Sequence, residues 1–133
     1  MAAARGAVGA RFRLHGRDPA TGLDCVGLVS WALKAGGFEG AVPSGYAIRG
    51  GDRDAVAALI AYLGLMPVAE AAAGDLVLAA SGPGQLHLAI MTDGGFVHAD
   101  AGLRRVVERP GVVPWPVVGC WRLVKWASRA SRS

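Results

Sequence analysis

Residues 22–29 read Gly22-Leu23-Asp24-Cys25-Val26-Gly27-Leu28-Val29, and they carry the signals of a helix start. Asp24 is a preferred N-cap residue. Apolar side chains then recur at helical spacing, at 26, 28, 29, 32 and 33. Gly36 and Gly37 end the pattern. We therefore expect an apolar helix from Asp24 to about residue 35, buried in the core, with Cys25 at its N-terminal end.

The rest of the chain divides into a second helix and a run of strands. The helix is expected to begin at Asp52 or Asp54 and to end at Gly64, while residues 1–22 are expected to be irregular. After Pro67 the segments become short and β-branched or alternating, which predicts strands at 76–80, 86–92, 96–99, 105–108 and 117–124. Asp93-Gly94-Gly95 predicts a hairpin turn of type I′. Helices followed by antiparallel strands predict an α+β domain.

Composition sets the bounds of this domain. The 133 residues are 53% hydrophobic and 18% charged, which predicts one domain with its own core, about 11–124, followed by a basic tail, 125–133. The net charge of +4 favours anionic partners, but the basic residues are scattered and no run of four exists, so nucleic-acid binding is not expected. No segment has the apolar length of a secretory signal or a membrane span, which predicts a cytoplasmic product with reduced thiols.

Cys25 is a candidate nucleophile because of its place at the start of a helix. Backbone N–H groups and the helix dipole there favour a thiolate and lower the thiol pKa. The same N–H groups can bind an oxyanion that develops on an attacked carbonyl. The competing interpretation is a small buried core residue, since most free cysteines are buried.

Two histidines favour the nucleophile interpretation. A cysteine nucleophile needs an imidazole to exchange its proton, and that imidazole needs an orienting partner. His87 lies on a predicted strand, on the face opposite Leu86, Leu88 and Ile90. His98 lies on the next strand, and the hairpin register is expected to place it opposite residue 90 or 91. Each histidine alone is equally consistent with a core residue bonded to a backbone carbonyl.

Four blocks of the sequence resemble the NlpC family of papain-like cell-wall cysteine peptidases. These blocks are Gly22 to Val29, Gly74-Asp75-Leu76-Val77, His87-Leu88-Ala89-Ile90-Met91 and Phe96-Val97-His98-Ala99, in the order and spacing of the family. The resemblance implies a papain-like fold in which N-terminal helices pack on a C-terminal antiparallel sheet. It also implies that Cys25 is the nucleophile, His87 the general base and acid, and His98 the residue that orients His87, with no cofactor and no metal.

The resemblance further implies a substrate, the stem peptides of peptidoglycan, often cut between D-γ-glutamate and diaminopimelate or lysine. The short stand-alone form resembles the peptidases of phage tails and gene transfer agents, which implies tail proteins as partners and delivery to the cell wall within a phage-like particle. Asp24 would cap the helix and could also face the amino group of the substrate.

The sequence departs from the family at two positions. Val26 replaces the usual serine but keeps its backbone N–H for an oxyanion. Phe12 stands where the family often has a tyrosine, so the phenolic hydroxyl is missing, and His15 could replace it at the rim.

Several alternatives stay open at this point. A zinc site formed by Cys25, His87, His98 and Cys120 lacks any short-range ligand pair, and Cys120 is expected to be a structural thiol. A catalytically silent component of a phage or gene-transfer-agent tail would keep the fold without needing the three candidate residues. A thiol amidase or acyltransferase would use the same triad with a different leaving group or acceptor.

Overall fold

The computed structural model describes residues 1–39, 42 and 52–122. The predicted basic tail, 125–133, and the expected last strand residue, Val124, lie outside the described residues, as does most of the loop 37–51. The described part begins with α1 (Ala2–Gly6), β1 (Arg17–Asp18), β2 (Gly22–Leu23), α2 (Cys25–Ala35) and α4 (Arg53–Tyr62). The strands β3 (Met66–Val68), β4 (Leu76–Gly82), β5 (Gln85–Met91), β6 (Gly95–Asp100), β7 (Arg105–Pro110) and β8 (Val117–Arg122) follow.

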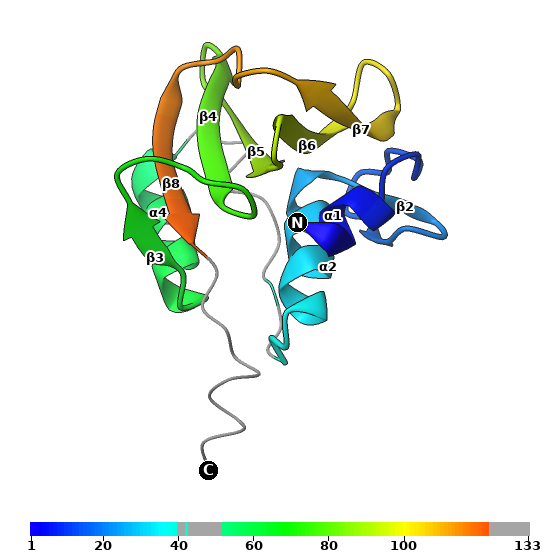
Figure 1. Ribbon diagram of the computed structural model, residues 1–133, viewed down its shortest axis with the longest axis horizontal. Coiled ribbons are helices and arrows are strands. Elements are labelled where there is room, and N and C mark those ends of the chain that lie inside the picture. Colours follow the sequence, from blue (N-terminus) through cyan, green and yellow to red (C-terminus); the bar gives the residue numbers. More distant parts are fainter. Residues whose placement is uncertain (40–41, 43–51, 123–133) are drawn as a thin grey trace.

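The main sheet has six antiparallel strands in the order β3-β8-β4-β5-β6-β7 (Figure 1). Helix α2 contacts β5 and β6, and α1 packs beside α2. The hydrophobic core joins the apolar side of α2 to alternating residues of β5 and β6, such as Leu88, Ile90, Val97 and Ala99. The predicted α+β arrangement, with helices packed on an antiparallel sheet, is confirmed.

Both long helices begin where the capping signals placed them. The side chain of Asp24 accepts a hydrogen bond from the N–H of Gly27 at the start of α2. At α4 the structure selects Asp52 rather than Asp54 as the cap, because Asp52 accepts from the N–H of Ala55 at 3.0 Å. None of the helices in the described ranges is long and apolar enough to cross a membrane.

Two segments differ from the sequence-based expectation. Residues 1–22 are not wholly irregular, because the alanine run forms α1 and buries Ala4 and Ala7 in the core. The three-residue strand β3 contains Pro67, which the sequence pattern treated as a boundary. Proline lacks a backbone donor but is tolerated at a sheet edge, and β3 is an edge strand.

The predicted hairpin between β5 and β6 is present, with a different turn. Thr92 donates its N–H to the carbonyl of Gly95 at 2.9 Å, which closes the loop. Gly94 does not have the positive φ that a type I′ turn requires. Gly95 is needed for another reason: a side chain there would overlap the carbonyl of Arg109 on β7. The glycine therefore permits close approach of two strands.

Candidate active site

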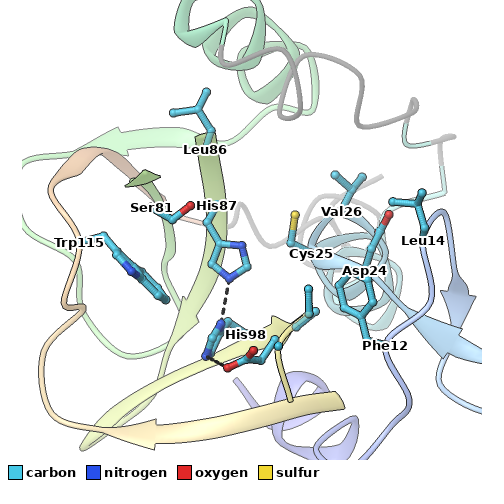
Figure 2. Close-up of a pocket in the computed structure, with 14 residues that line it drawn as sticks. Phe12, Leu14, Asp24, Cys25, Val26, Ser81, Leu86, His87, His98 and Trp115 are labelled. Carbon is cyan, nitrogen blue, oxygen red and sulfur yellow. Dashed lines mark hydrogen bonds and ion pairs between the residues drawn. The ribbon is translucent and has the colours of Figure 1, made fainter. Parts of the chain in front are cut away.

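A cleft of about 340 Å³ opens between the start of α2 and the strands β5 and β6 (Figure 2). Cys25 is the first residue of α2, His87 lies in β5 and His98 lies in β6. All three line the cleft, together with the predicted site residues Phe12, Asp24 and Val26. The start of α2, the strands β5 and β6 and the segment that contains Phe12 thus bring every predicted site residue except His15 to one cavity.

Asp24 builds the wall of the cleft through both of its carboxylate oxygens. Its Oδ1 accepts the N–H of Gly27 at 2.8 Å, and its Oδ2 accepts the N–H of His15 at 2.8 Å. The second bond ties the segment before β1 to the start of α2. A side chain at Gly27 would overlap the carbonyl of Gly16 in that segment. The Asp-Cys-Val-Gly sequence therefore fixes both the helix start and the chain that packs on it.

His15 does not line the cleft. Its backbone has a φ of 62°, in the left-handed region, and its contribution to the site is the N–H bonded to Asp24. Phe12 and Leu14 of the same segment line the cleft instead, and both are apolar. This wall can contact substrate by apolar packing and has no side-chain hydroxyl at position 12.

His87 and His98 meet directly. The ladder between β5 and β6 pairs Ile90 with Val97 and Met91 with Phe96, so position 98 falls opposite 89 rather than the expected 90 or 91. His87 is two positions further along the same face, which is a diagonal neighbour in an antiparallel pair. The Nε2 of His87 lies 2.8 Å from the Nδ1 of His98. The other ring nitrogen of His87, Nδ1, remains available to the cleft.

Burial sets the protonation state of the thiol. Burial and the carboxylate of Asp24 raise the pKa of Cys25 to about 11. The backbone N–H groups of Leu88, Val26 and Cys25 itself act in the opposite direction. The expectation that the helix start lowers this pKa is wrong, because the donors at the helix start offset only part of the effect of burial beside a carboxylate.

The imidazoles are also held in their neutral form. Burial, with His98 as a second cause, lowers the pKa of His87 to about 4, against a raising effect of Asp100. Burial likewise lowers the pKa of His98. At neutral pH the resting site therefore holds a neutral thiol and two neutral imidazoles. In such a pair one ring nitrogen donates the hydrogen bond and the other accepts it.

Two further residues beside the histidines were not assigned to the site from the sequence. Trp115, from the segment between β7 and β8, lies with its ring centroid 5.3 Å from that of His87 and 5.5 Å from that of His98. Asp100 has its Oδ2 at 3.9 Å from the Nε2 of His98. Asp100 carried a usable signal, since it follows His98 by two residues and shares its strand face. No spacing could have linked Trp115 to the histidines.

Cys120 lies apart from this site. It is buried in β8, its Sγ donates to the carbonyl of Val68 at 3.3 Å, and it lines a different cavity. Within residues 1–39, 42 and 52–122, no three His, Cys, Asp or Glu side chains are arranged to hold a metal ion. The four residues considered as zinc ligands are therefore not assembled.

The solved structures that are similar to this chain include the following two. One is the NlpC/p60 domain of the peptidoglycan hydrolase SagA, with 27% identity, coverage of 82% of this chain and 84% of that chain, and a TM-score of 0.50. The other is a protein similar to a lipoprotein of the NLP/P60 family from Staphylococcus aureus, with 24% identity and a TM-score of 0.60. This second match covers 93% of this chain and 40% of that chain.

No protein-family model and no curated protein sequence matches the chain. The phage or gene-transfer-agent type stays a prediction. Both structural neighbours carry the NlpC/P60 name, and the one with 27% identity matches over most of both chains. The chain therefore has the papain-like α+β fold of NlpC/P60 domains, and its resemblance to the NlpC family is confirmed.

Proposed function

We propose that this chain is a cysteine peptidase that hydrolyses peptidoglycan stem peptides, with Cys25 as nucleophile, His87 as general base and acid, and His98 as the residue that orients His87. The observation that carries the proposal is the cleft in which these three side chains meet, with His87 bonded to His98 at 2.8 Å. The similarity to a domain of a peptidoglycan hydrolase supports the choice of substrate.

The first step follows from the neutral resting pair. With the pKa of the Cys25 thiol near 11 and that of His87 near 4, the thiol keeps its proton until a carbonyl is in place. Sγ then attacks the carbonyl carbon while its proton passes to Nδ1 of His87. This is general-base activation of the nucleophile, rather than attack by a preformed thiolate.

The start of α2 supplies donors for the oxyanion. The first N–H groups of a helix have no intrahelical acceptor. Asp24 takes that of Gly27, while those of Cys25 and Val26 face the thiol side of the cleft. A single donor of this kind is worth about 10²- to 10³-fold in kcat. Phe12 cannot add a hydroxyl donor, so the backbone bears this role.

In the remaining steps His87 first donates the proton that it took from Cys25 and then accepts one from water. The imidazolium formed in the attack gives its proton to the leaving amine, the C–N bond breaks, and an acyl thioester on Cys25 remains. Water then attacks the thioester, with His87 as base, and the protonated thiol is restored. His98 holds the ring of His87 in one orientation through both halves of the reaction.

The finer parts of the proposal concern the bond and the setting. We propose that the scissile bond joins D-γ-glutamate to diaminopimelate or lysine, and that the chain acts within a phage-like particle that brings it to the cell wall. Both follow from the resemblance of the sequence. The apolar wall formed by Phe12 and Leu14 is available to aliphatic parts of such a peptide.

The test is cleavage of muropeptides that contain either diaminopimelate or lysine, followed by mass spectrometry under reducing conditions at neutral pH. We expect the wild type to release the predicted fragments. Cys25→Ala should lower the rate by at least about 10³-fold, since it removes the nucleophile. Cys120→Ala is the matched control, because that thiol lies in another cavity.

Three results would contradict the proposal. An inactive wild type that is correctly folded would favour the silent structural component. Equal activity of wild type and Cys25→Ala would show that Cys25 is not the nucleophile. Transfer of the acyl group to an added amine in preference to water would identify an acyltransferase.

A further inference from the structure

The second ring nitrogen of His98 is a feature that the proposed mechanism does not use. The Nδ1 of His98 contacts His87, but the second ring nitrogen, Nε2, is buried and has no hydrogen-bond partner within the described residues. The His98 side chain is only 3% exposed. Burial of an N–H without a hydrogen-bond partner is unfavourable, so the surroundings of this nitrogen determine which tautomer the ring adopts.

The group that faces this nitrogen is a carboxylate. Oδ2 of Asp100 lies 3.9 Å from Nε2 of His98. The other oxygen of Asp100, Oδ1, accepts the N–H of Leu103 at 3.0 Å, which holds the carboxylate in place. The remaining charged group near His98 is Arg109 on β7, which disfavours a positive charge on the ring.

We propose that Asp100 is a positioning residue that fixes the tautomers of both histidines, and so makes Nδ1 of His87 the proton acceptor for Cys25. This inference rests on the proposed function for its catalytic consequence. A carboxylate can only accept, so it favours the proton of His98 on Nε2. The Nδ1 of His98 is then an acceptor.

The tautomer of His98 determines the tautomer of His87. Because Nδ1 of His98 accepts, Nε2 of His87 must donate across the 2.8 Å contact. A neutral imidazole carries one proton, so Nδ1 of His87 then holds a free lone pair. That lone pair faces the cleft that Cys25 lines. With the opposite tautomers, Nδ1 of His87 would carry a proton and could not act as a base.

Asp100→Asn is the decisive substitution. The amide oxygen can keep the bond from the N–H of Leu103, so the turn is retained. The amide NH₂ group then takes the place of Oδ2 and presents a donor to Nε2 of His98. Two facing donors repel, which drives the proton of His98 to Nδ1 and reverses the order of both rings. Asp100→Ala removes the carboxylate without imposing this reversal.

Imidazole tautomers are measured by long-range ¹H–¹⁵N correlation on the ¹⁵N-labelled full-length chain at pH 8, where both rings are neutral. We expect wild-type His87 and His98 to carry their protons on Nε2. In Asp100→Asn the proton of His98 should move to Nδ1. The wild-type tautomers in both Asp100 variants would overturn the proposal. This readout needs no turnover, so it decides the role of Asp100 even if the wild type hydrolyses no muropeptide and the proposed function fails.

Kinetics separate positioning from substrate contact. We expect Asp100→Asn to lower kcat by about 10²- to 10⁴-fold, the range for a wrongly oriented catalytic imidazole, with an unchanged KM. Asp100→Ala should lose less than Asp100→Asn. Asp93→Asn is the matched control, since Asp93 is 68% exposed and forms its ion pair with Arg5, at the other end of the hairpin. A loss carried by KM would identify Asp100 as a substrate contact and overturn the proposal.

Discussion

The two edges of strand β5 differ in how they are paired, and the active site lies on the open one. Along β4, the ladder pairs residues from Leu76↔Ile90 to Gly82↔Gln85, and it includes Ala79↔His87. Along β6, only Ile90↔Val97 and Met91↔Phe96 are paired within the described residues. His87 is thus held through its backbone on one edge and faces an opening on the other.

The unpaired part of β5 leaves room for α2 to contact the sheet. Because Leu88 is not paired with β6, its N–H is directed toward the thiol of Cys25. The start of α2 contacts the sheet at this seam, where α2 lies against both β5 and β6. The comparison indicates a division of roles: the paired edge provides rigidity, and the open edge provides donors and room for a substrate.

Alkylation of Cys25 tests the electrostatics of the open edge, and of the tests that compare the two edges of β5 it has the largest expected effect. With a thiol pKa near 11, the thiolate fraction rises about tenfold per pH unit below that value, so the rate with iodoacetamide should rise about 100-fold from pH 7 to pH 9. The measurement uses the Cys120→Ala chain, so that only Cys25 reacts. A preformed thiolate–imidazolium pair would instead give a rate that is flat over this range.

The same chain in denaturant is the control for reagent chemistry. Its unfolded thiol has the ordinary pKa of about 8.5, so its alkylation rate should level off above pH 9 while that of the folded chain continues to rise. Coincident pH curves for the folded and unfolded chains would contradict the raised pKa of Cys25.

The sequence predicted the elements of the site better than their interactions. The helix start at Asp24 and the strands of His87 and His98 are local patterns, and they were predicted within a few residues. The hairpin register was wrong by about one residue, because the loop closes at Thr92 and Gly95 without positive φ. The thiol pKa was wrong because burial is a tertiary property, which no local pattern reports.

Contacts across long sequence separations could not be predicted where no motif marks both partners. Asp75 belongs to a block that supported the family resemblance, but nothing in that block named its partner. In the structure Asp75 binds Arg122, 47 residues away, through two hydrogen bonds at 3.1 and 3.0 Å. It also accepts the N–H of Ala72 at 2.8 Å. The role of this conspicuous aspartate is to join β4 to β8, not to act in the cleft.

Asp75→Asn weakens the link between β4 and β8, on the side of β5 that is paired with β4. The side chain of Asp75 is 3% exposed, and its loss of charge weakens the hydrogen bonds from Arg122. We expect the free energy of unfolding in urea to fall by about 1–3 kcal/mol, with kcat per folded molecule unchanged. Asp93→Asn is the control, because its exposed ion pair with Arg5 should contribute no more than about 1 kcal/mol.

The pH dependence of this deficit has a definite sign. Burial acts to raise the pKa of Asp75, but Arg122 and the N–H of Ala72 outweigh it, and the pKa is lower than its ordinary value. The stabilisation is therefore present above about pH 4 and is lost as pH falls through the lower, folded-state pKa. The difference between wild type and Asp75→Asn should shrink in acid. A difference that grows below pH 4 would contradict the ion pair.

Trp115→Ala tests how water is excluded from the open edge of β5, and it has the smallest expected effect. The ring centroid of its indole lies 5.3 Å from that of His87 and 5.5 Å from that of His98. Burial is the main cause of the low pKa of His87, which is about 4. Removing the indole should admit water and raise this pKa by about one unit. His87 must be neutral to act as a base, so kcat/KM at pH 5 should fall relative to pH 8. Trp31→Ala is the matched control, since Trp31 is 38% exposed on α2 and does not line the cleft. An unchanged acid limb in Trp115→Ala would mean that the strands and α2 alone exclude water from His87.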